Sequence, residues 1–358
     1  MPLFYPLKVA SIDRTAEDAV CVALSIPDSL KTVFTFRAGQ HVSVRRAVAG
    51  LTEYRTYSIV SGPDEQTLKL GVRVQPGGRV STLLGAALVV GDELEVAAPA
   101  GRFCTALDPS RTRSYVAFAA GSGITPILSL AKHCLAHELR SRFTLIYGNR
   151  SMAHTMFLDE TLALKNRYMS RFAVHFVMSR EPQQSHFLNG RIDAAKVREL
   201  SIRIAAIGAS DEYFVCGPGA MVDEVRGALQ QLNGEAPILF ERFAVRPPAA
   251  AKTDAPVTAF SADELLATIS VTMDGRVREF PMSPKDASVL EAAERAGLEL
   301  PFSCRAGICA TCRTRITSGA AVMAHNIALE PWEVDAGFVL CCQARPITQA
   351  LAISYDQK

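Results

Sequence analysis

Five of the nine cysteines lie between Cys304 and Cys342, and their spacing is that of an iron–sulfur site. Four residues separate Cys304 from Cys309 and two separate Cys309 from Cys312, which is the plant-type [2Fe-2S] spacing of one loop completed by a distant cysteine. Gly307 and the small residues around it would let backbone N–H groups approach the cluster sulfurs. The pattern therefore predicts a [2Fe-2S] cluster.

The fourth ligand comes from the pair Cys341 and Cys342 in the segment GFVLCCQARP. Neighbouring residues of an extended segment point to opposite faces, so only one of the two can face the cluster. Tetrahedral zinc is the alternative occupant. Zinc sites usually present a close pair of cysteines in each half, whereas the second half offers only adjacent cysteines, and this favours iron and sulfur.

The segment VAFAAGSGITPILSLA predicts a strand, a glycine turn and the start of a helix. Gly121 and Gly123 permit a tight turn with close backbone approach, Thr125 could cap the helix, and Pro126 suits its first turn. Unpaired N–H groups at such a helix start attract a pyrophosphate. The segment indicates a dinucleotide site, and an ordinary strand-to-helix turn is the alternative.

A second turn, Cys216-Gly217-Pro218-Gly219, follows the predicted strand DEYFV. Ligands of open parallel sheets gather at the carboxyl ends of the strands, where this turn lies. The Cys216 thiol could contact a nicotinamide ring there, and simple burial of the thiol is the alternative.

Two motifs in the first hundred residues suit a flavin. Arg55-Thr56-Tyr57-Ser58 supplies a cation for a phosphate, a ring for stacking on a flat heterocycle, and a hydroxyl for its heteroatoms. Gly77-Gly78-Arg79-Val80-Ser81 could wrap a pyrophosphate with backbone amides and a hydroxyl. Each motif alone is also compatible with an ordinary barrel residue or turn.

These motifs lie in three predicted domains joined by one linker. Short alternating segments in residues 1–109 predict an antiparallel β-barrel, and alternating strands and helices in 110–246 predict a Rossmann-like parallel sheet. Residues 247–264 are rich in Pro and Ala and predict a linker, and 265–358 begin with a predicted hairpin turning at Asp274-Gly275. The fold class is β plus α/β plus α+β.

The bulk composition excludes several function classes. The chain has 358 residues, 49% of them hydrophobic and 21% charged, with a formal net charge of +2. A charge so nearly balanced gives no reason to expect nucleic acid as a partner. Every apolar run is too short for a spanning helix, and the N-terminus lacks a signal-peptide pattern. We therefore expect no membrane insertion and a cytoplasmic location.

Taken together, RTYS, GGRVS, GSGITP, CGP and the C-terminal cysteine loop resemble the ferredoxin-NADP reductase superfamily, in the arrangement with a C-terminal β-grasp ferredoxin domain. The resemblance covers the whole chain. FTLIYGNR, CATC and the LEP before VLCCQA are similar to the reductases of phenylacetyl-CoA epoxidases, which are multicomponent oxygenases of phenylacetate degradation. The resemblance implies electron transfer to a terminal oxygenase as partner.

The resemblance also implies roles for individual residues. Ser58 and Cys216 would position the hydride transfer, and no general acid or base is assigned. Cys342 would be the fourth cluster ligand, because the 29 residues between Cys312 and Cys342 equal the interval in plant-type ferredoxins. The implied FAD residues are Arg55, Tyr57, Ser58, Val72, Val74, Gly78, Val80, Ser81 and Phe243, and the implied nicotinamide residues are Gly121, Thr125, Cys216, Gly217 and Pro218.

The nicotinamide type follows from the ends of the second and third strands. An acidic residue there would favour NAD, but the second strand ends at Arg150 with no carboxylate. Ser179 and Arg180, after the third strand, match the position where NADP-using relatives hold the phosphate, so we expect NADPH, with NADH possible. Solvated surface arginines are the alternative.

Electron counting then orders the cofactors. A nicotinamide gives up two electrons at once and a cluster accepts one, so FAD must stand between them. The predicted enzyme is an NAD(P)H-dependent reductase passing electrons through FAD and [2Fe-2S]. The alternatives are a reductase for a ring-hydroxylating, steroid or fatty-acid oxygenase or a desaturase, and a non-catalytic protein with structural zinc.

Overall fold

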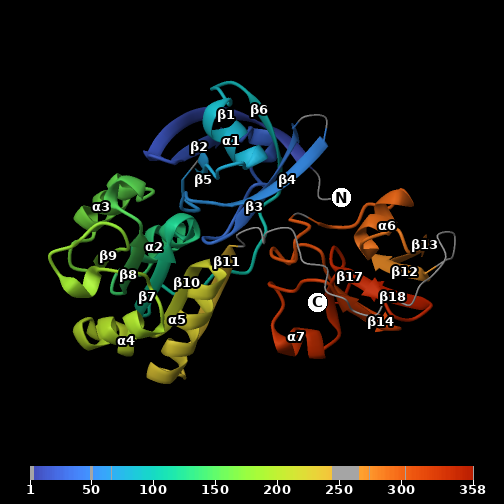
Figure 1. The fold of residues 1–358 in the computed structure, drawn as a ribbon. Coiled ribbons are helices and arrows are strands. Elements are labelled where there is room, and N and C mark those ends of the chain that lie inside the picture. The colour runs from blue at the N-terminus through green and yellow to red at the C-terminus, as the bar shows by residue number, and fades with distance from the viewer. Residues whose placement is uncertain are drawn as a thin grey trace. The chain divides into compact units, whose positions relative to one another are not determined.

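The computed structural model describes residues 4–48, 51–65, 67–243, 266–273, 275–302 and 304–357. They divide into two compact units, one before and one after the segment 244–265 (Figure 1). The predicted linker 247–264 and Asp274 of the predicted hairpin turn lie outside the described residues.

The first unit begins with a six-stranded antiparallel sheet in the order β4-β3-β6-β1-β2-β5. Its edges approach each other, because Ile59 bridges Leu70 and Val60 N donates to Lys69 O at 2.9 Å. This contact curls the sheet into the predicted barrel. The elements are β1 (Phe4–Ala16), β2 (Ala19–Ser25), β3 (His41–Val48), β4 (Leu51–Ser58), β5 (Thr67–Arg73), α1 (Arg79–Ala86) and β6 (Glu93–Ala97).

A five-stranded parallel sheet follows in the order β11-β10-β7-β8-β9. The chain adds β8 and β9 on one side of β7 and then crosses to add β10 and β11 on the other. The carboxyl ends of β7 and β10 therefore form a topological switch point, where open sheets bind ligands. The strands are β7 (Ser114–Ala120), β8 (Arg142–Asn149), β9 (Phe172–Met178), β10 (Glu212–Pro218) and β11 (Ile238–Phe243).

Helices cover both faces of this sheet (Figure 1), and strands covered on both faces are accordingly apolar throughout. The α2 helix is buried nearly all round because it lies between the sheet and the barrel, where it packs with Cys21 and Val60. The α4 and α5 helices pack on the opposite face. The helices are α2 (Ile124–His137), α3 (Leu158–Arg167), α4 (Ala194–Arg203) and α5 (Gly219–Leu232).

The second unit holds a five-stranded sheet in the order β13-β12-β18-β14-β16. β12 and β13 pair antiparallel from Ala267 with Met282 to Met273 with Arg276, which confirms the predicted hairpin. β12 and β18 pair parallel. The elements are β12 (Ala267–Met273), β13 (Arg276–Met282), α6 (Val289–Arg295), β14 (Arg313–Ser318), β15 (Ala321–Met323), α7 (Pro331–Asp335), β16 (Phe338–Leu340), β17 (Ala344–Pro346) and β18 (Ala350–Ser354).

Candidate functional site

The loop from Cys304 to Cys312 directs backbone amides at sulfur. The N–H groups of Ala306, Ile308 and Cys309 each lie 3.4 Å from Cys304 Sγ. Gly307 has φ +73°, and a Cβ there would lie 2.7 Å from the carbonyl oxygen of His325. The hydrogen bond from Cys304 holds the pKa of Cys309 well below its ordinary value. Amide donors around thiolates fit an iron–sulfur cluster, whose sulfurs need such hydrogen bonds.

The two adjacent cysteines have different surroundings. Cys341 Sγ lies 2.9 Å from the hydroxyl of the buried Tyr355. Cys342 faces the loop instead, because the Gly307 amide and Gln343 Nε2, at 3.7 Å, are directed at its sulfur. The neighbouring Cys312 thiol, together with burial, raises the pKa of Cys342. These contacts support Cys342 as the fourth ligand, and the assignment stays a prediction.

The two glycine turns of the parallel sheet meet at its switch point. Gly121–Gly123 forms a 3₁₀ turn between β7 and α2, and Gly121 has φ +55°. A Cβ on Gly123 would lie 2.1 Å from the carbonyl oxygen of Cys216 at the end of β10. Gly217 and Pro218 continue β10 past this contact. The close backbone approach explains why glycine stands at position 123.

Thr125 does not cap α2, contrary to the sequence expectation. The 3₁₀ turn places the helix start at Ile124, so the N-cap is Gly123 and Thr125 is already inside the first turn. Its hydroxyl donates to Ser122 O at 2.8 Å. Its methyl group would lie 2.4 Å from a Cβ on Gly71 of β5. Thr125 therefore packs against the barrel, and its contact with the nicotinamide cofactor stays a prediction.

Four side chains from both sheets converge beside the switch point. Ser58 at the end of β4 pairs with His41 of β3. His41 Nδ1 lies 3.5 Å from Glu241 Oε1, and Cys216 Sγ lies 4.0 Å from Glu241 Oε2. The barrel thus delivers Ser58 and His41 to the place where the parallel sheet delivers Cys216 and Glu241.

His41 and Glu241 were absent from the sequence prediction. The signal for Glu241 was its position two residues before Phe243 on a strand, since such residues share a face. His41 carried no local signal, because its partner is the Glu241 carboxylate, 200 residues away in the sequence. Phe243 ends β11 beside Pro218, and its side chain is not among those described.

The thiol of Cys216 is fully buried. Burial, followed by the charge of Glu241, raises its pKa well above the ordinary value, so the thiol stays neutral. A neutral buried thiol is not a nucleophile. The buried sulfur is not accessible to a nicotinamide ring in this structure, so the predicted contact with that ring stays a prediction.

At the predicted phosphate end of the flavin site, two arginines form ion pairs with one carboxylate. Arg55 of β4 and Arg79, the first residue of α1, lie 3.0 and 3.1 Å from the two oxygens of Glu53. Gly78 is the N-cap of α1, and the Ser81 hydroxyl accepts from Gln75 N at 3.1 Å. Amides at a helix start beside two guanidinium groups fit a pyrophosphate.

The remaining flavin predictions divide by burial. Val72 and Val80 are buried in the barrel core, so only their backbone could face a ligand. Val74 is half-buried and keeps accessible surface. Tyr57 packs on the barrel core, and burial raises its pKa, which suits a neutral ring.

Arg150, Ser179 and Arg180 lie side by side at the carboxyl edge of the parallel sheet. Arg180 N donates to Arg150 O at 2.9 Å, and the Ser179 hydroxyl donates to Asn149 O at 3.2 Å. All three residues are exposed. Two guanidinium groups and a hydroxyl at this edge suit a ribose 2′-phosphate.

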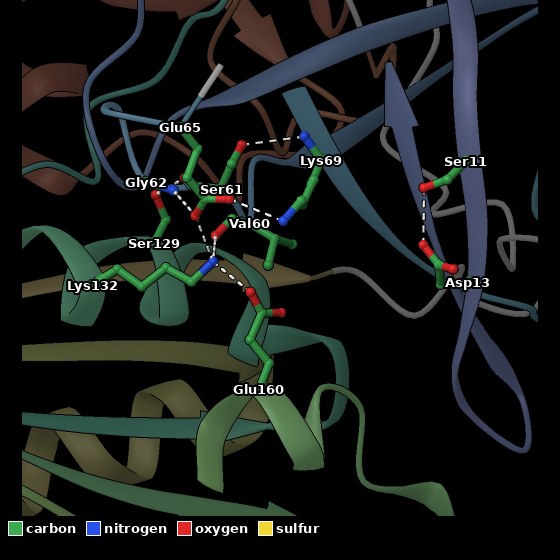
Figure 2. A network of polar contacts seen from close by, with 10 residues as sticks. All are labelled: Ser11, Asp13, Val60, Ser61, Gly62, Glu65, Lys69, Ser129, Lys132 and Glu160. Carbon is green, nitrogen blue, oxygen red and sulfur yellow. Dashed lines mark hydrogen bonds and ion pairs between the residues drawn. The ribbon is translucent and has the colours of Figure 1, made fainter. Parts of the chain in front are cut away.

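A polar network joins the barrel to the parallel-sheet domain (Figure 2). Lys132 Nζ of α2 lies 2.8 Å from Glu65 Oε1 of the barrel and 2.6 Å from Glu160 Oε1 of α3. It also donates to Val60 O at 3.3 Å. The Ser129 hydroxyl donates to Ser61 O at 2.7 Å. The network holds the two halves of the candidate site together.

Three family models match consecutive parts of the chain. An oxidoreductase FAD-binding domain matches residues 6–104, an oxidoreductase NAD-binding domain matches 118–227, and a 2Fe-2S iron-sulfur cluster binding domain matches 271–346. These matches coincide with the barrel, the parallel sheet and the cysteine loop.

A full-length relative decides the family. The chain is 36% identical over 359 residues to a subunit of the 1,2-phenylacetyl-CoA epoxidase of Escherichia coli K12, covering 100% of this chain and 99% of that one. The chain belongs to the iron–sulfur flavoprotein reductases of the ferredoxin-NADP reductase superfamily. It is also 30% identical to the ferredoxin reductase component of a 3-ketosteroid-9-alpha-monooxygenase of Rhodococcus rhodochrous, covering 98% and 96% of the two chains.

A solved structure supports the architecture of this reductase. Phthalate dioxygenase reductase matches with a TM-score of 0.59 and 27% identity, covering 98% of both chains. The predicted fold class and the FAD, nicotinamide and [2Fe-2S] cofactors are thereby confirmed, and the zinc alternative falls away. Among the helices that the structure describes, none is long and apolar enough to cross a membrane.

Proposed function

We propose that this reductase takes electrons from NADPH and delivers them to a terminal oxygenase acting on phenylacetyl-CoA. The observation that carries the proposal is the 36% identity to the E. coli epoxidase component along the whole of both chains. The steroid oxygenase relative follows at 30%, and a glycine betaine monooxygenase reductase subunit of Pseudomonas aeruginosa at 28% over 88% of this chain.

When bound, FAD would supply both two-electron chemistry with the nicotinamide and one-electron chemistry with the [2Fe-2S] cluster. The protein's contribution is to position the rings. Cys216 and Glu241 of the parallel sheet meet His41 of the barrel, and Ser58 pairs with His41 in the barrel sheet. The backbone contact at Gly123 sets how closely the two nucleotide turns approach.

NADPH as the donor is supported by the charge at the sheet edge. Arg150 and Arg180 lie beside Ser179, and no carboxylate ends β8. A 2′-phosphate would gain charge-assisted hydrogen bonds from these side chains, whereas the 2′-hydroxyl of NADH offers no charge.

Reconstitution tests the acceptor. The purified holoenzyme, with NADPH, would be combined separately with the oxygenase components of a phenylacetyl-CoA epoxidase, a ketosteroid monooxygenase and a glycine betaine monooxygenase. We expect product formation coupled to NADPH oxidation only with the first set. Efficient turnover with another set, and none with phenylacetyl-CoA, would refute the proposal.

A further inference from the structure

A second group of potential metal ligands lies away from the cysteine loop, between the barrel and α2. It consists of Asp64, in the barrel loop after β4, and His133 and His137 of α2, whose ligand atoms all lie within 4.8 Å of one another. His137 Nε2 is 2.7 Å and His133 Nδ1 is 3.8 Å from Asp64 Oδ2. The two imidazole rings are 4.4 Å apart.

Helical geometry places the two histidines on the face that meets the barrel. They are four residues apart, so their side chains lie one above the other. The same face carries Ser129 and Lys132, which bind Ser61 O and Val60 O of the barrel loop (Figure 2). Contacts that involve neither histidine therefore hold the Asp64 loop against α2.

The loop is also fixed immediately beyond Asp64. Glu65 N donates to Gly62 O at 3.0 Å, and Glu65 Oε1 accepts from Gly62 N and from Lys132 Nζ, both at 2.8 Å. These contacts lock the turn and the helix together, so the three side chains are held facing one another. Such preorganisation lowers the entropy lost when a ligand binds.

One ring nitrogen of His133, Nδ1, has no hydrogen-bond partner among the described residues. Nδ1 is buried and makes no hydrogen bond with the described residues, and Asp64 Oδ2 at 3.8 Å is too far to serve. Tetrahedral ligation with bonds of about 2.0–2.2 Å needs ligand atoms about 3.4 Å apart. The observed 2.7 and 3.8 Å lie on either side of that value. A tetrahedral site therefore requires the Asp64 carboxylate to move away from His137 and toward His133.

We propose that Asp64, His133 and His137 bind one divalent first-row transition-metal ion such as Zn²⁺, joining the flavin barrel to α2. Two imidazole nitrogens and one carboxylate oxygen suit such an ion, with water in the fourth position, whereas Mg²⁺ and Ca²⁺ prefer oxygen ligands only. The side chains are 25%, 40% and 65% exposed for His133, His137 and Asp64, so an ion can enter from solvent.

Calorimetric titration tests the site. Holoenzyme carrying FAD and its cluster, freed of loosely bound metal with a chelator, would be titrated with ZnCl₂. We expect one saturable site. Asp64→Asn and the double variant His133→Gln/His137→Gln should each weaken binding by about tenfold or more, since even residues that only orient a ligand are worth about that much.

His154→Gln is the matched control. His154 lies 3.7 Å from Glu17 and is 30% exposed, so it forms a similar histidine–carboxylate pair, and among the described residues this pair belongs to no three-ligand group. This variant should bind zinc as the wild type does. Absence of saturable binding to the wild type would overturn the proposal, and so would unchanged affinity in the double variant, because the zinc would then sit on other groups such as free thiols.

Thermal release of FAD provides a second readout. An ion that joins the barrel to α2 binds only the folded pair, so zinc at a hundredfold excess over its dissociation constant should raise the release temperature by roughly 5–10 °C. The variants should show no shift, and their FAD content without zinc reports that they fold. A shift of equal size in the double variant would contradict the site.

Discussion

Cys341 and Cys342 are adjacent and chemically identical, but their thiols have different surroundings. Tyr355 hydrogen-bonds one thiol, and the Gly307 amide is directed at the other. The two residues lie in a turn after β16, closed by Gln343 N donating to Leu340 O at 2.8 Å, and this turn gives the adjacent side chains different neighbours.

Replacing Cys342 by Ser should therefore remove the cluster and spare the flavin. Iron content and the cluster's visible absorption should be lost, while NADPH-driven reduction of ferricyanide through FAD persists. Transfer to the oxygenase should stop. Iron analysis, the visible spectrum and the two activities measure these outcomes.

Cys341→Ser is the matched control, since it alters a neighbouring thiol by the same single atom. This variant should keep the cluster, because the sulfur that it replaces is hydrogen-bonded to the Tyr355 hydroxyl. If Cys341→Ser lost the cluster and Cys342→Ser retained it, the ligand assignment would be reversed.

Substitution of Arg180 tests whether the enzyme prefers NADPH to NADH. Arg180→Ala should raise KM for NADPH about tenfold or more, because a hydrogen bond to a charged group is worth about 1.5–3 kcal/mol. KM for NADH should change by less than about twofold, because its 2′-hydroxyl carries no charge. Steady-state kinetics with both donors measure the difference, and equal changes would show that Arg180 does not contact the phosphate.

Among the elements, the turn between β7 and α2 sets the approach of the two nucleotide motifs. Gly123→Ala would put a methyl group where the Cys216 carbonyl lies 2.1 Å away. Overpacking of this kind costs about 1–3 kcal/mol and displaces the backbone. We expect lower stability and a hydride-transfer rate reduced by about a hundredfold, as a displacement of about 1 Å can cause. Thermal unfolding and stopped-flow flavin reduction measure the two effects.

Gly227→Ala in α5 is the contrasting control. Within the described residues, no atom outside the helix's own backbone lies within 4 Å of a Cβ at this position, and the residue is inside a helix. Alanine there should stabilise the protein by about 0.5–1 kcal/mol and leave flavin reduction unchanged. A rate loss in this variant as large as that of Gly123→Ala would remove the steric explanation.

For the whole molecule, Lys132 holds the barrel and the parallel-sheet domain together. Lys132→Met would leave Glu65 and Glu160 facing each other without their shared cation. We expect a loss of about 1–3 kcal/mol, between the values for exposed and buried pairs. Lys31→Met, in an exposed pair with Asp28, should leave stability nearly unchanged, because solvent screens such a pair. Chemical denaturation compares the two, and equal effects would exclude a joining role.

The pH dependence of stability provides a second measure of this contact. Burial alone would raise the pKa of Glu65, but hydrogen bonds from Lys132, Gly62 and Lys69 hold it below its usual value. The stabilisation is therefore fully present above the unfolded pKa of about 4.3, and it is lost as pH falls through the lower folded value. In Lys132→Met the loss of stability over this acidic range should be smaller.

Sequence by itself determined the features that are local in the chain. The cluster loop spans only Cys304–Cys312, and the glycine turns carry their own backbone requirements, so spacing and residue type predicted both. The barrel and the parallel sheet followed from the alternation of short segments, and the β12–β13 hairpin followed from the turn signal Asp274-Gly275. The start of α2 was missed because a 3₁₀ turn precedes it.

Tertiary structure alone decided which distant residues meet. His41 reaches Glu241 because β3 and β11 belong to sheets that pack together, and Asp64 reaches His133 and His137 because α2 lies between those sheets. Single-chain periodicity reports which face of an element is buried, but not what covers it. Partners separated by dozens to hundreds of residues are therefore set by topology and packing, and so is Tyr355, which lies beside Cys341 although the two are 14 residues apart in the sequence.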